Sequence, residues 1–440
     1  MTVTEAIDQI RRRNPSINAF VNLRITEALV DGEARAREPA RSPLHGVPYG
    51  LKDEWETRCL PTTGGSFRHR TRRSTHDSRV FEVFEQAGAV LVGKTNLSDL
   101  GLAPESTNYL CGSTRNPFDP TRTAGGSSGG AAAAVATGMA AFDWGTDIGG
   151  SIRMPAAFCG IVGIRLSHEA WPLRDLFPRV PAVLDWLCGQ GPMATNLDQL
   201  RCLVDVARPA LRTGTPRDFD FQGFTLYVPK HLGRWPTFAR DVQERLTRLA
   251  RTLDCEVSAD HGLPGTKETM HAYAGTWSAH LEDLLEADPD IGTLQAAIPA
   301  MLSAALVRGL AGDRRFHPDC AELVLAMALG RITIFRDKHR ALQNAYAVRD
   351  AFGEVWSRGH VIVAPVCMYP APRLGHTNYN THLIECTVPG NLADATGLSL
   401  PFGRFGHLPR GIQLLGPPGS EILLLDLAEQ LTQNVTKARP

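Results

Sequence analysis

A run of glycine and serine leads directly into a run of alanine near residue 130. Residues 125–130 read Gly-Gly-Ser-Ser-Gly-Gly, and residues 131–136 read Ala-Ala-Ala-Ala-Val-Ala. Alanine is the best helix former and has almost no side-chain volume, so this segment predicts a buried helix close to neighbouring backbone. The unpaired N–H groups of its first turn favour negative charge beside Ser127. A flexible linker would instead continue in polar residues.

A second run of small residues follows, where residues 146–153 read Thr-Asp-Ile-Gly-Gly-Ser-Ile-Arg and Ser151 lies 24 positions after Ser127. Its backbone N–H groups can point at one spot beside the hydroxyl of Ser151, as an oxyanion hole requires. Lys52 follows the apolar stretch 46–51, so we expect it to be buried. A buried lysine whose pKa is lowered by about 3 units can act as a base near pH 7. Lys52, Ser127 and Ser151 together make a complete candidate proton relay.

These motifs, in this order and spacing, resemble the amidase signature family of serine hydrolases, which includes bacterial aryl acylamidases and urethanases. The resemblance spans nearly the whole chain and is weak only from about residue 166 to residue 357. Further matching segments are 43–48, 62–66, 87–96, 116–119, 159–163, 191–193 and 411–419. The resemblance implies that Ser151 is the nucleophile, that Ser127 bridges it to the base Lys52, and that the Gly126–Ser127 peptide is cis.

The resemblance also implies an oxyanion hole made of backbone N–H groups, each worth about 3–4 kcal/mol of transition-state stabilisation. The residues that would supply them are Ile148, Gly149, Gly150 and Ser151.

Four neighbouring residues are expected to support this centre. Thr146 matches a threonine that hydrogen-bonds the bridging Ser127, and Ser128 offers an auxiliary hydroxyl. Asp147 and Arg153 are expected to form a structural ion pair beside the nucleophile.

Helix and strand signals alternate along the chain, which is typical of an α/β protein. A capping box of Thr2 and Glu5 predicts a helix at the start of the chain. Asp77 is expected to cap a helix that stops at Gly88 and precedes a buried strand at 89–92. Further strands are expected at 361–365 and 411–415, and further helices at 242–253 and 422–431.

We therefore expect a single large domain over 1–440, with a mixed β-sheet core surrounded by α-helices. Its catalytic core motifs would occupy 43–165. A variable substrate-pocket region would occupy about 166–357, and C-terminal core strands and a helix would occupy 358–435.

The composition favours a chain whose only partner is a small molecule. Its 46 basic and 46 acidic side chains cancel, so nothing marks a surface for nucleic acid or an anionic membrane. No stretch approaches the about 18 apolar residues of a membrane span, and the start does not resemble a signal peptide. Nine scattered cysteines without metal-ligand spacing suggest reduced thiols in the cytoplasm. We expect no metal, no cofactor, and a monomer or homodimer.

The leading functional hypothesis is a hydrolase of carbon–nitrogen bonds other than peptide bonds. Its substrates would be small or medium uncharged amides, anilides or carbamates (urethanes), cleaved through an acyl-enzyme on Ser151. Three aromatic residues in the variable region, Trp171, Phe177 and Trp186, are expected to build an apolar pocket wall.

Two alternatives remain. One is the glutaminase subunit of a tRNA-dependent amidotransferase, ranked second because the chain lacks that subunit's Gly-x-Glu-Val-Lys-Arg-Arg-Ile run and its longer C-terminal region. The other is an α/β-hydrolase esterase with Ser128 in a G-x-S-x-G elbow at residues 126–130. That elbow must follow a strand, and the two prolines in 116–122 disfavour a central strand there.

Overall fold

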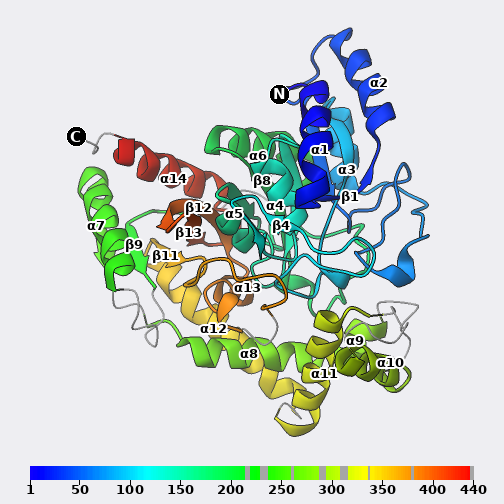
Figure 1. Ribbon diagram of the computed structural model, residues 1–440. Helices are drawn as coiled ribbons and strands as arrows, with labels where there is room; N and C mark the ends of the chain where they lie inside the picture. The colour runs from blue at the N-terminus through cyan, green and yellow to red at the C-terminus, as the bar shows by residue number, and fades with distance from the viewer. Residues whose placement is uncertain are drawn as a thin grey trace.

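The computed structural model describes residues 1–213, 219–227, 236–258, 262–286, 294–307, 316–334, 337–377 and 381–436. This part of the chain folds around one sheet of eleven strands (Figure 1). In spatial order the strands are β1 (Phe20–Leu23), β3 (Val90–Thr95), β2 (Pro48–Lys52), β6 (Phe142–Asp147), β8 (Gly189–Ala194), β7 (Val162–Arg165), β12 (Thr396–Phe405), β13 (Leu408–Gly416), β11 (His360–Pro365), β9 (Gly223–Leu226) and β10 (Glu256–Ser258).

The sheet is mixed, as expected. Strands β3, β2 and β6 are mutually parallel, and so are β11, β9 and β10. The strands between these two groups pair antiparallel. Because β7 pairs with β12, the early and late parts of the chain share one sheet and one core. The expectation of a single α/β domain is confirmed, whereas its subdivision at 43–165, 166–357 and 358–435 stays a prediction.

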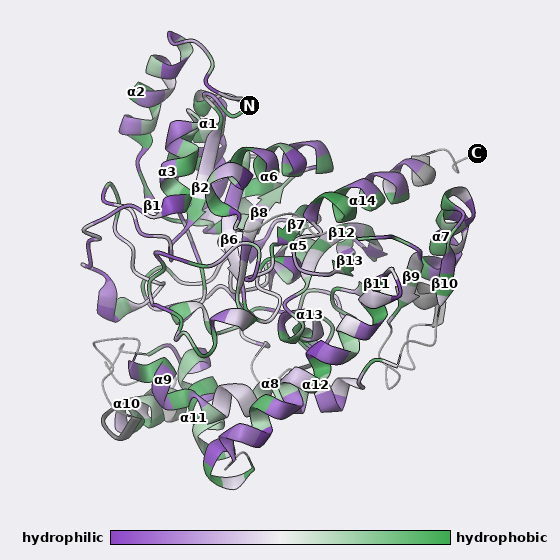
Figure 2. Ribbon diagram, turned by 180° about the vertical axis from the view of Figure 1, so that it is seen from behind, coloured by the Kyte–Doolittle hydropathy of each residue, from purple (hydrophilic) through white to green (hydrophobic). Residues whose placement is uncertain are grey.

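Helices surround the sheet. They are α1 (Val3–Ile17), α2 (Ile25–Ala36), α3 (Arg79–Gln86), α4 (Gly129–Ala136), α5 (Arg153–Cys159), α6 (Leu197–Leu211), α7 (Pro236–Leu253), α8 (Thr266–Ala279), α9 (Leu281–Glu286), α10 (Leu294–Val307), α11 (Pro318–Thr333), α12 (Lys338–Ser357), α13 (Val388–Leu392) and α14 (Glu421–Thr436). Figure 1 shows α8 to α12 grouped on one side of the molecule and α1 to α3 on the opposite side. The outer helices carry both hydrophilic and hydrophobic residues (Figure 2), as amphipathic helices on a core do. None of the helices within the described ranges is both long and apolar enough to cross a membrane.

The predicted caps are partly right. Thr2 and Glu5 form the expected capping box, with the Thr2 N–H donating to the Glu5 carboxylate at 2.7 Å. The second helix, α3, is capped by Ser78, whose hydroxyl accepts from the Phe81 N–H at 3.4 Å. Asp77 was the wrong cap because its carboxylate binds Arg58 at 2.7 Å instead.

The glycine-alanine segment forms α4, and residues 129–135 are all buried. Gly130 lies against backbone, since a Cβ there would collide with Asn96 and lie 2.6 Å from the Ala19 carbonyl oxygen. The proline-containing segment before it forms only a small separate sheet of β4 (Arg115–Asn116) and β5 (Asp119–Thr123). No central strand therefore precedes Ser128 at the place where an elbow needs one.

Candidate active site

Lys52 ends strand β2 between β3 and β6 and is fully buried. Its Nζ donates to the Ser127 hydroxyl at 2.7 Å and to the Thr146 hydroxyl at 2.8 Å. Burial lowers the pKa of Lys52, and the Glu54 carboxylate 3.1 Å away opposes this shift. A buried lysine against a serine hydroxyl is the arrangement that a lysine base requires.

Ser127 lies just before α4 and is 2% exposed. Its peptide bond with Gly126 is cis, as the resemblance implies. Ser106 secures this turn, because its hydroxyl donates to the Ser127 carbonyl at 2.8 Å and accepts from the Gly129 N–H at 2.7 Å. Sequence reasoning missed Ser106, which lies in a loop without a recognisable motif.

Ser151 follows β6 on the loop that leads into α5, and it is partly exposed. Its carbonyl accepts from the Ser128 N–H at 3.3 Å, which ties the two glycine-serine runs together. The Ser128 hydroxyl is buried and donates to the Thr146 carbonyl at 3.3 Å. Ser151 lines a cavity of about 120 Å³, so the nucleophile candidate is open to a small ligand.

One of the four expected oxyanion donors already has an acceptor within the protein. The Gly150 N–H donates to Asp147 Oδ1 at 2.8 Å, so it is not free for an oxyanion. The N–H groups of Ile148, Gly149 and Ser151 have no acceptor among the described residues. Three backbone donors are therefore left for an oxyanion hole. The carbonyl groups of Ile148 and Gly149 accept from the hydroxyls of Tyr273 and Thr387.

Thr146 contacts the base rather than the bridging serine. Its hydroxyl accepts from Lys52 and donates to Glu54 Oε2 at 2.7 Å. The expected hydrogen bond to Ser127 is therefore replaced, because Lys52 Nζ lies between the two hydroxyls and donates to both. Sequence reasoning missed Glu54, because it lies in the turn after β2, where the alternation of a strand no longer places side chains.

Asp147 and Arg153 form a fully buried ion pair at 2.9 Å. Burial alone would raise the pKa of Asp147, but the Arg153 guanidinium and further hydrogen bonds hold it below its usual range. Arg153 also donates to Gln413 at 2.8 Å and to Asn391 at 2.6 Å. The pair anchors the Ser151 loop to the C-terminal part of the sheet.

The three aromatic residues expected to line the pocket lie elsewhere. Trp171 is fully buried in the main core, and Phe177 packs edge-on against His69 at 4.7 Å. Trp186 stacks on Tyr346 at 5.7 Å. The hypothesis was wrong because apolar core residues and pocket residues look alike in a sequence.

Helices from the variable region build the cavity wall instead. Apart from Ser151, the cavity is lined by Gly101, Leu102, Ala103, Pro104, Gly126, Ile148, Gly149, Tyr273, Trp277, Leu323, Met327 and Ile384. The Tyr273 hydroxyl donates to the Ile148 carbonyl at 3.2 Å, so α8 also braces the oxyanion segment. The lining residues come from α8, α11 and the loops after β3, before α4, after β6 and before α13, which only the fold brings together.

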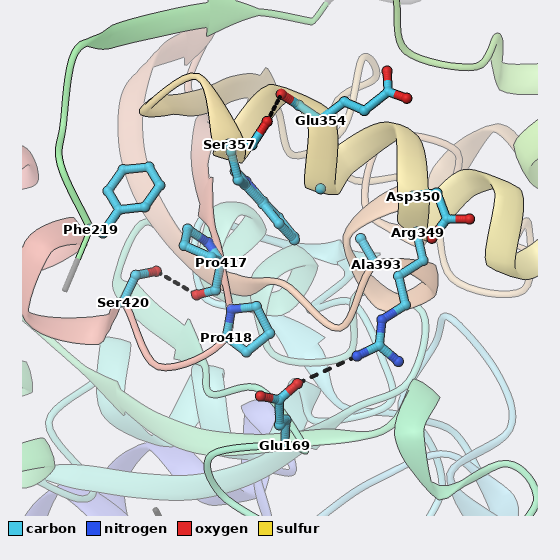
Figure 3. A pocket seen from close by; sticks show the side chains of 12 residues that line it. Glu169, Phe219, Arg349, Asp350, Glu354, Ser357, Ala393, Pro417, Pro418 and Ser420 are labelled. Carbon is cyan, nitrogen blue, oxygen red and sulfur yellow. Dashed lines mark hydrogen bonds and ion pairs between the residues drawn. The ribbon is translucent and has the colours of Figure 1, made fainter. Parts of the chain in front are cut away.

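A larger open hollow of about 610 Å³ lies between α12 and the loop before α14 (Figure 3). Trp356, Pro417 and Pro418 line it, and Arg349 pairs with Glu169 at 3.4 Å. It shares no lining residue with the cavity at Ser151.

Within the described ranges, no three histidine, cysteine or carboxylate side chains come together as a metal site.

The family model described as Amidase matches residues 1–256 and 313–425. The chain belongs to the amidase signature family. Members of this family act on carbon–nitrogen bonds. A glutamyl-tRNA(Gln) amidotransferase subunit from Halobacterium salinarum is 31% identical over 453 residues, which cover 95% of this chain and 100% of the relative.

Solved amidase signature structures share the fold. A 6-aminohexanoate cyclic dimer hydrolase, complexed with substrate, superposes with a TM-score of 0.77 at 21% identity, over 98% of this chain and 92% of the other. A bacterial aryl acylamidase gives a TM-score of 0.74 at 23% identity, over 100% and 95% of the two chains. At these identities the likeness concerns the fold alone.

The similarity to the amidotransferase subunits overturns two expectations. The leading hypothesis of a free-standing hydrolase of uncharged amides, anilides or carbamates is wrong, because full-length relatives are subunits of an amidotransferase. For the same reason, the expectation of a small molecule as the only partner, with no nucleic acid and no other subunit, is wrong. The argument from a missing C-terminal region also fails, since this chain covers 93% to 100% of these relatives.

Proposed function

We propose that the chain is the glutamine-hydrolysing subunit of a tRNA-dependent amidotransferase. The observation that carries the proposal is the similarity to the Halobacterium salinarum protein, which extends over 95% of this chain. The bond cleaved would be the side-chain amide of glutamine, a carbon–nitrogen bond other than a peptide bond. The nitrogen released would be transferred to glutamyl-tRNA(Gln) with the help of partner subunits.

The contacts around Lys52 support a serine mechanism for this reaction. Neutral Lys52 takes a proton from Ser127, which takes one from Ser151, and Ser151 Oγ attacks the carboxamide carbon. The free N–H groups of Ile148, Gly149 and Ser151 stabilise the oxyanion. The relay then returns the proton to the leaving nitrogen, ammonia departs, and water hydrolyses the acyl-enzyme to glutamate.

The cavity suits the part of glutamine that carries the amide. Two methylene groups precede its carboxamide, and they fit a small space whose walls include Leu102, Trp277 and Met327. The carboxamide would lie against Ser151 and Gly149, which also line the cavity.

The test is ammonia release from glutamine by the purified chain, alone and with its co-expressed partner subunits and glutamyl-tRNA(Gln). We expect release that partner subunits stimulate and that Ser151→Ala abolishes, with asparagine as a poor substrate because it is one methylene shorter. The proposal is overturned if glutamine yields no ammonia under either condition while Ser151 still reacts with a fluorophosphonate.

A further inference from the structure

Glu54 contacts the candidate base Lys52 and one of the two hydroxyls to which Lys52 donates. Its Oε1 lies 3.1 Å from Lys52 Nζ, and its Oε2 accepts from the Thr146 hydroxyl at 2.7 Å. Thr146 in turn accepts from Lys52 at 2.8 Å, so the three side chains form a closed set of hydrogen bonds. Glu54 is 7% exposed and Lys52 is fully buried, so water screens their interaction little.

The backbone holds Glu54 in this position. The chain turns after β2, where the Glu54 N–H donates to the Lys52 carbonyl at 2.7 Å, and the Glu54 carbonyl accepts from the Phe177 N–H at 2.8 Å. Gly101 leaves room for the carboxylate, because a Cβ there would lie 2.5 Å from Glu54 Oε1. The carboxylate therefore occupies a prepared space beside Lys52.

Other ionisable groups near this pair have partners of their own. On β6, Asp147 pairs with Arg153, and Asp143 accepts from Thr95 at 3.0 Å while burial raises its pKa to about 8. Asp53, the residue between Lys52 and Glu54, lies 3.8 Å from Lys94.

The Cys188 thiol also lies near Glu54, and burial raises its pKa well above the usual value. Glu54 is thus the carboxylate in direct contact with Lys52 among the described residues.

We propose that Glu54 is a positioning residue of the reaction, which holds Lys52 against Ser127 and sets how readily Lys52 gives up its own proton before it serves as the base. The inference rests on Lys52 being the base of the proposed function. Two opposed effects act on Lys52: burial disfavours its ammonium form, and the Glu54 carboxylate favours it. Removing the Glu54 carboxylate takes away the largest effect that opposes burial, while Asp147 and Asp143 remain, so Lys52 becomes neutral at lower pH.

The test follows Ser151 acylation by a fluorophosphonate against pH, because this reaction needs the relay but not glutamine. In wild type the rate should rise with pH as Lys52 loses its proton. In Glu54→Gln this rise should move to lower pH by about 1 to 3 units. Glu54→Asp keeps the negative charge but at a greater distance from Lys52, so the rise in rate should move in the same direction by a smaller amount. This variant replaces Glu54→Gln in the test if Glu54→Gln does not fold.

Glu56→Gln is the matched control. Glu56 is buried two residues further along, but it pairs with Arg72 at 2.5 Å, so its neutralisation should leave the pH midpoint in place. A Glu54 variant with an unmoved midpoint, whatever its rate, would overturn the inference and leave the glutaminase proposal standing. Failure to release ammonia from glutamine, with the midpoint moved as expected, would overturn the glutaminase proposal alone. If Ser151 of the wild-type protein never reacts with the fluorophosphonate, both the inference about Glu54 and the glutaminase proposal are overturned.

Discussion

Neighbouring serines in the first glycine-serine run differ in what their hydroxyls contact. Ser127 Oγ accepts from Lys52 at 2.7 Å, whereas Ser128 Oγ donates to the Thr146 carbonyl at 3.3 Å and is fully buried. A hydroxyl that donates to a backbone carbonyl has no base to take its proton. Ser151, which lines the cavity, is the better nucleophile candidate.

Ser151→Ala should therefore abolish covalent labelling by a fluorophosphonate, as measured by intact mass. Ser128→Ala removes one hydrogen bond, worth about 1 kcal/mol, and should still be labelled. The reverse pattern, with Ser128→Ala unlabelled and Ser151→Ala labelled normally, would support the esterase elbow instead.

At the scale of the element, the position of α4 is determined by the close contact of its glycines with the backbone of other segments. A helix of glycine and alanine has little intrinsic amphipathicity, yet residues 129–135 are all buried. Close approach is possible only because no side chain separates α4 from the Asn96 backbone and the Ala19 carbonyl. This packing places the start of the helix beside Ser127.

Gly130→Ala should lower the free energy of unfolding by about 1–3 kcal/mol or more, because the added methyl group must displace backbone. Gly353→Ala is the matched control in α12, where a Cβ meets nothing within 4 Å. It should stabilise the protein by about 0.5–1 kcal/mol through helix propensity. Urea denaturation measures both changes, and equal effects at the two positions would contradict the packing argument.

At the scale of the whole molecule, buried ion pairs join early and late parts of the chain. Arg165 ends β7 and donates to Asp394, which precedes β12, at 3.1 Å. Asp394 also accepts from the His168 and Glu169 N–H groups at 2.7 and 2.9 Å. Burial raises the pKa of Asp394 above its usual value even with Arg165 beside it, so this carboxylate depends on its counter-ion.

Arg165→Leu should lower the free energy of unfolding by about 3–5 kcal/mol, because it leaves Asp394 buried without its partner. Arg349→Leu is the control, since Arg349 and Glu169 are 37% and 39% exposed and such a pair contributes at most about 1 kcal/mol. Both variants should unfold in one transition that fluorescence and circular dichroism report alike. Two separated transitions would contradict a single cooperative domain.

The candidate relay residues could be chosen from the sequence because their signals are local. Lys52, Ser127 and Ser151 stand in short motifs, in which glycine permits the positive φ seen at Gly125 and Gly150 and alanine favours the helix α4. The partners were predicted wrongly because the argument used only the net charge of the chain. A net charge of zero says nothing about the charge of one surface of the protein. The similarity over nearly the full length of the chain favours the amidotransferase subunit instead.

The sequence by itself thus determined the fold class, the capped first helix, the buried α4 and the three candidate relay residues, since each follows from short-range pattern and residue chemistry. Only the tertiary structure decided that Gly150 donates to Asp147, that Thr146 and Glu54 hold Lys52, and that Tyr273 and Trp277 wall the cavity. These contacts join segments far apart in the chain or depend on where a turn directs one side chain. Their partners are chosen by packing of the whole domain, which no local pattern records.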